Sequence, residues 1–136
     1  MVKVLVKRLN SKVKLPEYKT SGSSGMDLMA SIDSPIKIAP NTLELIPTGL
    51  SIAIPEDLEI QIRPRSGLAA KSNIGVLNTP GTIDSDYRGE LKIILFNHGN
   101  KDFIVNNNDR VAQMVLMPVI KMEIEEVDQL PKTIRG

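Results

Sequence analysis

Segments dense in polar residues and glycine interrupt an otherwise alternating sequence, and the segment at residues 63–71 has the composition of an anion site. Arg65 offers a planar fork of donors that matches phosphate oxygens, and Ser66 adds a hydroxyl group. Gly67 lets the backbone approach a ligand because no Cβ stands in the way. A short helix that starts here would turn its free amides toward the same spot. The segment predicts a phosphate cradle, with a basic surface turn as the alternative.

Residues 77–90 carry turn residues followed by polar side chains. Asn-Thr-Pro-Gly predicts a β-hairpin whose arms run over residues 74–77 and 82–86. A hairpin arm exposes its N–H and C=O groups in a fixed order, which allows it to read a planar base. The side-chain amide of Asn78 carries both a donor and an acceptor, and this pair suits the edge of uracil.

Carboxylates in the second expected arm are the candidates for acid–base chemistry. Asp84 and Asp86 are two residues apart, so in an extended arm they share one face and Tyr87 takes the other. A solvated turn is the alternative for Asp-Ser-Asp. The single histidine, His98, lies in an Asn-His-Gly-Asn turn, and the chain has no cysteine. Thiolate nucleophiles, disulfides, Cys-based zinc sites and His-pair metal motifs are therefore excluded.

The elements that must position these segments have the pattern of β-strands. Ile and Val together number 26 against four aromatic residues, and branching at Cβ favours the pleated surface of a sheet. Apolar and polar residues alternate wherever glycine and proline, nine of each, do not interrupt the chain. Only residues 66–71 are suited to a helix, and a short one. The sequence therefore predicts one all-β domain over residues 1–136, built as a sandwich, barrel or jelly roll.

Two apolar runs and the charge balance bear on partners. Residues 91–96 and 111–120 are nearly continuous apolar runs, typical of strands buried on both sides, and they favour contact with another subunit. The net charge of +1 gives no reason to expect nucleic acid or an anionic membrane as a partner. Residues 1–8 alternate like a strand rather than a signal peptide, and no apolar stretch reaches the ~18 residues that span a bilayer. We therefore expect a cytoplasmic protein.

Taken in order, four segments resemble the motifs of the trimeric dUTP diphosphatase (dUTPase) family. The segments are Gly25-Met-Asp-Leu-Met-Ala30, Arg63-Pro-Arg-Ser-Gly-Leu-Ala69, residues 78–90, and Arg110-Val-Ala-Gln113. Within the third, Gly-Thr-Ile-Asp-Ser-Asp-Tyr-Arg-Gly-Glu is a specific match. The resemblance spans nearly the whole chain. Four matches in the family's order outweigh the surface-turn alternatives that each segment allows by itself.

The resemblance implies a jelly-roll-like β barrel that assembles as a homotrimer, with active sites at the subunit interfaces. The implied reaction is hydrolysis of dUTP to dUMP and diphosphate, with magnesium (Mg²⁺) on the triphosphate as cofactor. In the family this reaction limits uracil incorporation into DNA and supplies dUMP for dTMP synthesis. Asp84 is expected to be the base that orients the water attacking the α-phosphorus. Tyr87 is expected to stack on the deoxyribose and exclude a 2′-hydroxyl.

The remaining roles that the resemblance implies concern binding. Uracil would be read by Asn78 and by the backbone near Thr82 and Ile83, and Lys92 would touch the nucleotide through its backbone. Asp27 would contact Mg²⁺-bound waters or fix the phosphate loop. The residues expected to hold phosphates are Arg65, Ser66, Gly67 and Gln113.

The C-terminus departs from the family pattern. The family ends in a glycine-rich fifth motif that closes over the nucleotide and stacks a phenylalanine on uracil, whereas this chain stops at Arg135-Gly136, which resemble the first two residues of that motif. Phe96 and Phe103 fall in expected strands and do not replace it. We expect a trimmed chain rather than a family member without the lid. Such a chain is expected to form trimers and bind nucleotide but turn over poorly until a tail of this type is added.

Two alternatives stay open. A dCTP deaminase of the same fold would carry Arg-Ser-Ser where this chain has Arg65-Ser66-Gly67, and it would need a glutamate beside the cytosine C4 that the expected hairpin lacks. A non-catalytic, nucleotide-binding regulatory protein is the other alternative, and the missing lid is its only support.

Overall fold

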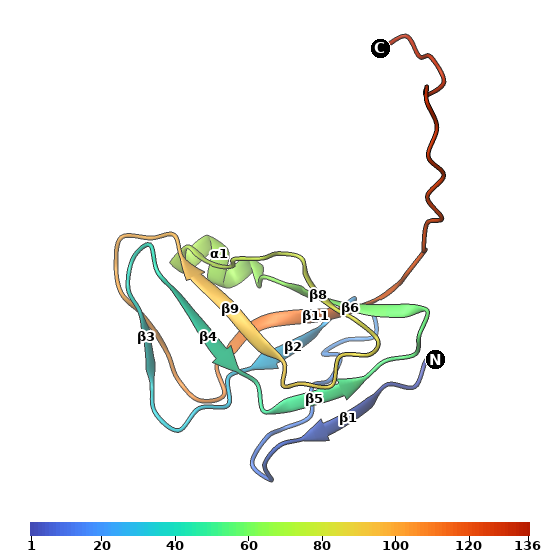
Figure 1. The fold of residues 1–136 in the computed structure, drawn as a ribbon. Helices are drawn as coiled ribbons and strands as arrows, with labels where there is room; N and C mark the ends of the chain where they lie inside the picture. The colour runs from blue at the N-terminus through green and yellow to red at the C-terminus, as the bar shows by residue number, and fades with distance from the viewer.

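Short antiparallel strands account for nearly all of the regular secondary structure in the computed structural model, which describes residues 1–136 (Figure 1). The all-β prediction with one short helix is confirmed. None of the helical structure has the length and apolar character that a membrane-spanning helix needs. The elements are β1 (Leu5–Arg8), β2 (Met26–Met29), β3 (Ile36–Ile38), β4 (Leu43–Pro47), β5 (Leu50–Ala53), β6 (Leu58–Arg63), α1 (Ser66–Ser72), β7 (Ile74–Val76), β8 (Gly81–Ile83), β9 (Lys92–Asn97), β10 (Phe103–Val105) and β11 (Arg110–Pro118).

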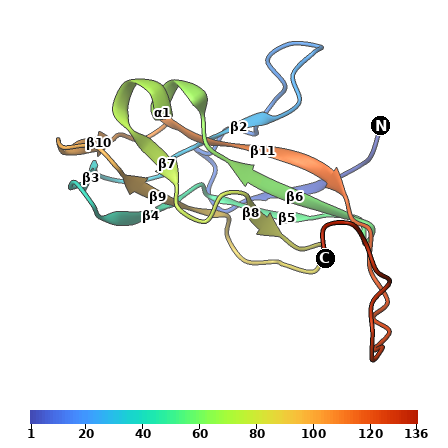
Figure 2. The same cartoon turned by 90° about the horizontal axis from the view of Figure 1, so that it is seen from above.

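The strands form a four-stranded sheet, a three-stranded sheet and two strand pairs. The order is β2-β11-β6-β8 in the larger sheet and β4-β9-β7 in the smaller one, and β1 pairs with β5 as β10 does with β3. Figure 2 shows these sheets and strand pairs from above, with α1 toward one end of the molecule. Because nearly every pairing joins strands far apart in the sequence, segments separated by tens of residues come side by side.

A cluster of 19 buried apolar residues fills the space between the sheets. The period-two pattern places them there: in β5 and β6 the buried residues alternate with half-buried ones, as Ile60 and Ile62 do on either side of Gln61. Burying such side chains stabilises the fold by roughly 1.5–3 kcal/mol each.

The two apolar runs are less buried in a single chain than their sequence predicts. In β9 only alternate residues are buried, and Ile94 and Phe96 are half-buried. Ile120, the last residue of the second run, is 94% exposed. The prediction that both faces are buried is therefore wrong for β9 and for the end of the second run, whereas in β11 the neighbouring residues 111–112 and 114–115 are all buried, so both faces of that strand are covered. A continuous apolar run indicates only that both faces avoid water, and one chain covers only part of each run.

The expected hairpin at residues 74–86 does not form. β7 pairs with β9, and β8 pairs with β6, so the two arms belong to different sheets. The connection continues along the smaller sheet, where the Leu77 amide donates to the Ile94 carbonyl. Turn residues at 78–81 predict a chain reversal, but long-range burial of Ile74 against β9 and of Gly81 against β6 decides the partners.

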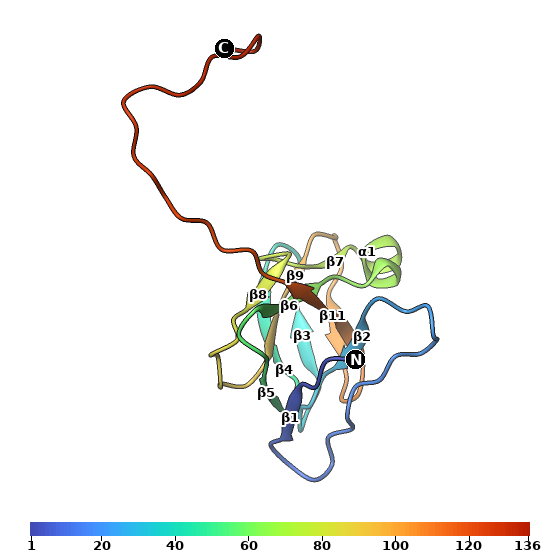
Figure 3. The same cartoon turned by 90° about the vertical axis from the view of Figure 1, so that its right-hand side faces the viewer.

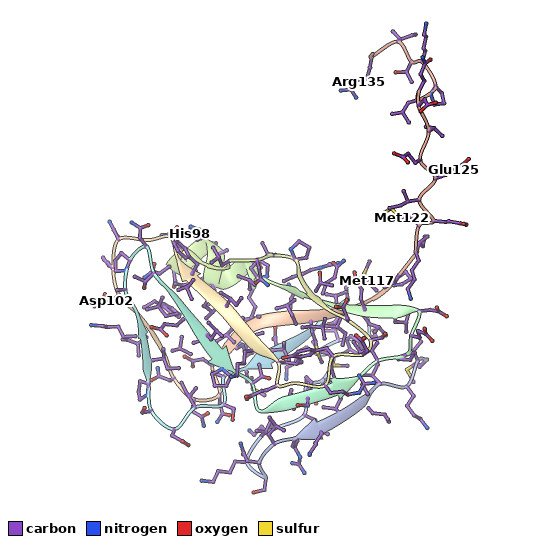
Figure 4. The ribbon with its side chains drawn as sticks, viewed as in Figure 1. His98, Asp102, Met117, Met122, Glu125 and Arg135 are labelled. Atoms are coloured by element: carbon purple, nitrogen blue, oxygen red, sulfur yellow. The ribbon has the colours of Figure 1, made fainter.

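The segment after β11 runs away from the sheets (Figures 1 and 3). All residues from 120 to 136 are exposed, and Met122, Glu125 and Arg135 point outward along it in Figure 4. Arg135, the expected remnant of the lid motif, lies near the far end of this segment, well away from the sheets (Figure 4).

Gly49, in the turn between β4 and β5, has a backbone conformation that requires glycine. Its φ is +69°, and a Cβ there would lie 2.5 Å from Cγ2 of Val13. We expect Gly49→Ala to lower the free energy of unfolding by about 3 kcal/mol, since left-handed backbone and overpacking both cost energy. Urea denaturation measures this. Gly22→Ala, which meets nothing within 4 Å, is the control; equal midpoints for the two variants would contradict the prediction.

Candidate active site

Asp27 is the centre of a charged cluster formed by three separate segments. One carboxylate oxygen accepts a hydrogen bond from Nε of Arg65 at 3.0 Å, and the other lies 3.6 Å from Nη1 of Arg110. The side chains of Asp27 and Arg65 are 22% and 24% exposed, so solvent screens this pair less than it screens a surface pair. Two guanidinium groups pair with one carboxylate, so the cluster carries a net positive charge. Arg110 is the most exposed of its three side chains.

β11 brings this cluster together because it is the shared neighbour of β2 and β6. Gln113 lies opposite Asp27 on one side and opposite Arg63 on the other. The Gln113 side-chain amide donates to the Pro64 carbonyl at 3.0 Å, which ties β11 to the segment that leads into α1. Three of the four sequence motifs therefore meet along β11. Arg110 belongs to the fourth motif but had no role predicted from the sequence, and the structure adds it to the cluster through its pairing with Asp27.

Close backbone approach at Gly25 is part of this arrangement. A Cβ at this residue would lie 2.9 Å from Oε1 of Gln113 and 3.0 Å from the Met114 carbonyl. Only glycine lets β2 lie this close to β11 at that point. The need for glycine here is steric rather than conformational, since Gly25 has no positive φ.

Ser66 and Gly67 form the first turn of α1, next to Arg65. Arg65 is the N-cap residue with extended backbone (φ −89°, ψ 128°), and no side chain caps the helix. The first turn holds no acidic residue, and both Ser66 and Gly67 are exposed. The unpaired N–H groups of this turn are thus open to a ligand that approaches Arg65.

The segment after β8 carries the candidate base and the aromatic residue. The Tyr87 amide donates to the Asp84 carbonyl at 3.2 Å, so a turn begins at Asp84. The expectation that Asp84 and Asp86 share the face of an extended arm is therefore wrong, because the strand ends at Ile83. The Asp84 carboxylate is exposed and makes no hydrogen bond or ion pair with another side chain, and Tyr87 is 44% exposed.

The residues expected to bind the nucleoside lie between the end of β7 and the start of β9. Asn78 lies in the connection before β8 and is exposed, as is Thr82, whereas Ile83 is half-buried. Lys92 is exposed at the start of β9, opposite Pro47.

One chain does not bring Asp84 to the arginine cluster. Ile83 lies opposite Ile60, so Asp84 leaves the sheet toward the start of β6, whereas Arg65 follows its end. From Ile60 to Arg63 alone the separation along the strand is about 10 Å. Figures 1 and 2 show the β8–β9 connection and α1 toward opposite ends of the molecule. The candidate residues thus form two groups, which are named here for the roles expected of them: the phosphate-binding cluster (Asp27, Arg65, Arg110, Gln113) and the nucleoside loop (residues 78–92).

Comparison with known proteins assigns the chain to a family. The dUTPase family model matches residues 11–136. The chain is 54% identical over 129 residues to the deoxyuridine 5'-triphosphate nucleotidohydrolase of Treponema denticola, covering 95% of this chain and 90% of that protein. The chain belongs to the dUTPase family. The protein of the same name from Syntrophotalea carbinolica is 48% identical over 135 residues, covering 99% of this dUTPase-family chain and 92% of that protein.

Solved dUTPase structures share the fold. A mutant of the phage 80alpha dUTPase superposes with a TM-score of 0.88 at 21% identity, covering 98% of this chain and 94% of that one. A mutant dUTPase from phage phi11 of S. aureus, whose structure describes a structural Mg(II) ion, gives 0.85 at 20% identity, covering 96% and 99%. The predicted jelly-roll-like β fold is thereby confirmed. The family match and the two nucleotidohydrolases at 48% and 54% identity confirm the prediction of an enzyme.

Proposed function

We propose that this chain, acting as one dUTPase-like domain over residues 1–136, hydrolyses dUTP to dUMP and diphosphate as a homotrimer. Membership of the dUTPase family is the observation that carries the activity. The relatives named as nucleotidohydrolases favour hydrolysis over the deaminase alternative. The separation of the phosphate-binding cluster from the nucleoside loop supports an active site completed by a second copy of the chain.

The phosphate-binding cluster is suited to neutralise a triphosphate. Arg65 would present its remaining guanidinium donors to phosphate oxygens while its Nε stays on Asp27. In this role Asp27 fixes the phosphate loop. Ser66, Gly67 and Gln113 would add hydroxyl, backbone and amide donors around the same phosphates.

The nucleoside loop would supply recognition and the base. Asn78 and the backbone near Thr82 and Ile83 would bind the uracil edge, with Lys92 contacting the nucleotide through its backbone. Tyr87 would stack on the deoxyribose.

Asp84 would act on the attacking water. Its exposed carboxylate, free of side-chain partners, would accept a proton from the water and orient its oxygen toward the α-phosphorus. The water oxygen would form a bond to the α-phosphorus while the bond from that phosphorus to the α–β bridging oxygen breaks, and diphosphate would leave with the bridging oxygen.

The residues present fit Mg²⁺ that arrives with the nucleotide. No three acidic or histidine side chains gather as a cage, and both oxygens of Asp27 face guanidinium groups. Mg²⁺ keeps several waters and readily takes its other ligands from phosphates. When bound, it would neutralise charge on the triphosphate. Asp27 would reach it only through its waters.

The proposed cellular role is to limit uracil incorporation into DNA and to supply dUMP for dTMP synthesis, in the cytoplasm. The substrate is a small molecule, and the net charge of +1 argues for neither nucleic acid nor membrane as a further partner.

Diphosphate release from dUTP, UTP, dCTP and dTTP tests the proposal. We expect release from dUTP alone, and we expect EDTA to lower its rate by about two orders of magnitude or more because charge neutralisation dominates phosphoryl transfer. A chain extended by the family's glycine-rich, phenylalanine-containing tail should turn over faster. Excess Mg²⁺ restoring the rate is the control for EDTA. No release by either chain, despite a folded oligomer, would favour the regulatory alternative.

A further inference from the structure

The Tyr87 ring is held on the backbone of its own loop. Its hydroxyl donates to the Glu90 carbonyl at 3.0 Å, which folds the side chain back over residues 88–90. The Arg88 guanidinium closes the other half of the loop, with Nη1 donating to the Ser85 carbonyl at 2.6 Å and the Tyr87 carbonyl at 3.1 Å. Tyr87 is 44% exposed and is not part of the buried core, so core packing does not fix the direction of its ring. The local contacts of the loop must do so.

The Tyr87 ring occupies the space where a side chain at residue 89 would lie. A Cβ at this position would lie 2.5 Å from Oη and 2.7 Å from Cζ of Tyr87, much closer than atoms approach without a bond. The observed ring position and a side chain at residue 89 therefore exclude each other. Gly89 has no positive φ, so its backbone conformation is open to alanine. Glycine at this position leaves space for the Tyr87 ring, whereas the backbone of the turn does not require it.

Glu90 fastens this loop to the body of the protein. Its Oε1 accepts a hydrogen bond from the Gly49 amide at 3.0 Å, in the turn between β4 and β5. The next residue makes three further hydrogen bonds: the Leu91 amide donates to the Leu50 carbonyl, and the amide and hydroxyl of the buried Thr48 both donate to the Leu91 carbonyl, at 3.2 and 2.6 Å. The carbonyl that accepts the Tyr87 hydroxyl therefore belongs to an anchored residue.

We propose that Gly89 and the Glu90 carboxylate are positioning residues for Tyr87, and that they set how strongly the enzyme rejects a nucleotide with a 2′-hydroxyl. The inference rests on the proposed function, in which the Tyr87 ring lies against the deoxyribose. A ring kept on Gly89 and tied to Glu90 presents one fixed face to the sugar. A displaced ring leaves room for the extra hydroxyl of UTP, and positional errors of this size change rates strongly.

The ratio of kcat/KM for dUTP to that for UTP is the main measurement. We expect Gly89→Ala to lower this ratio by about tenfold or more, because the new methyl group pushes an exposed ring off its place. Thermal stability should stay the same, since the ring has room to move outward. Gly22→Ala, with nothing within 4 Å of the added Cβ, is the matched control and should keep the wild-type ratio. A folded Gly89→Ala variant with the wild-type ratio would overturn the inference.

The Glu90 anchor is tested by a conservative pair. Glu90→Gln keeps an oxygen that accepts from the Gly49 amide and should retain most of the selectivity, whereas Glu90→Ala should lose it. If Glu90→Gln and Glu90→Ala have the same ratio of kcat/KM for dUTP to that for UTP, the Glu90 carboxylate does not position Tyr87. Its role as a positioning residue would then be refuted.

Tyrosine fluorescence reports the ring position without turnover. The chain has two tyrosines and no tryptophan, so in a Tyr18→Phe background all emission comes from Tyr87. Acrylamide should quench this emission more strongly in Gly89→Ala than in Gly22→Ala; equal quenching would overturn the inference even in an inactive protein. A wild-type enzyme that hydrolyses UTP as fast as dUTP would instead refute the role of Tyr87 in the proposed function, and quenching would still decide whether Gly89 positions the ring.

Discussion

Asp84→Asn is expected to lower kcat for dUTP hydrolysis by about three orders of magnitude, in the range that general-base catalysis contributes. Asparagine keeps the volume of the side chain but cannot accept a proton from the attacking water. Because Asp84 is exposed and has no side-chain partner, the substitution removes no contact from the fold. Binding of a non-hydrolysable dUTP analogue should therefore stay within about threefold of wild type.

The appropriate control is a neutralised carboxylate elsewhere on the surface. Asp102 precedes β10, at the end of the molecule that lies away from the β8–β9 connection (Figure 4). It pairs only with Lys37, at 3.9 Å. Asp102→Asn should keep wild-type turnover. Single-turnover and steady-state kinetics would separate chemistry from product release. Near-normal kcat in Asp84→Asn would show that another group activates the water.

Mixed oligomers are expected to recover activity that neither parent variant has. In the proposed mechanism Arg65→Gln removes a phosphate-binding group and Asp84→Asn removes the base, so each variant alone should lose at least about a hundredfold in kcat/KM. The structure places the two residues toward opposite ends of β6, so a site that needs both takes them from two chains. When the variants are mixed in equal amounts, some interfaces combine an intact nucleoside loop with an intact phosphate-binding cluster.

The expected recovery has a definite size. With random mixing, about one quarter of the sites receive both intact groups, so activity should rise to about a quarter of wild type. Asp84→Asn mixed with Tyr87→Ala is the matched control. Both changes lie in one loop, so every loop in that mixture carries a defect and no recovery is expected. Refolding the mixtures together and measuring diphosphate release gives the result. No recovery in the first mixture would contradict a site shared between chains.

The sequence by itself determined the local character of this protein. Period-two alternation and the excess of Ile and Val predicted strands, and the only segment suited to a helix, at 66–71, is the one that forms it. The four motifs predicted the family, and the comparisons confirm it. These features are readable because side-chain periodicity and turn residues act within a few positions along the chain.

Tertiary structure alone decided which segments became neighbours. Turn residues at 78–81 predicted a hairpin, yet each arm pairs with a distant strand because burial against β6 and β9 determines the pairing. The pairing of Asp27 with Arg65 and Arg110 depends on β11 lying between β2 and β6, and the Glu90 contact with Gly49 joins residues 41 positions apart. Contacts of this kind leave no periodic signal in the sequence, since they depend on how whole sheets pack rather than on local residue order.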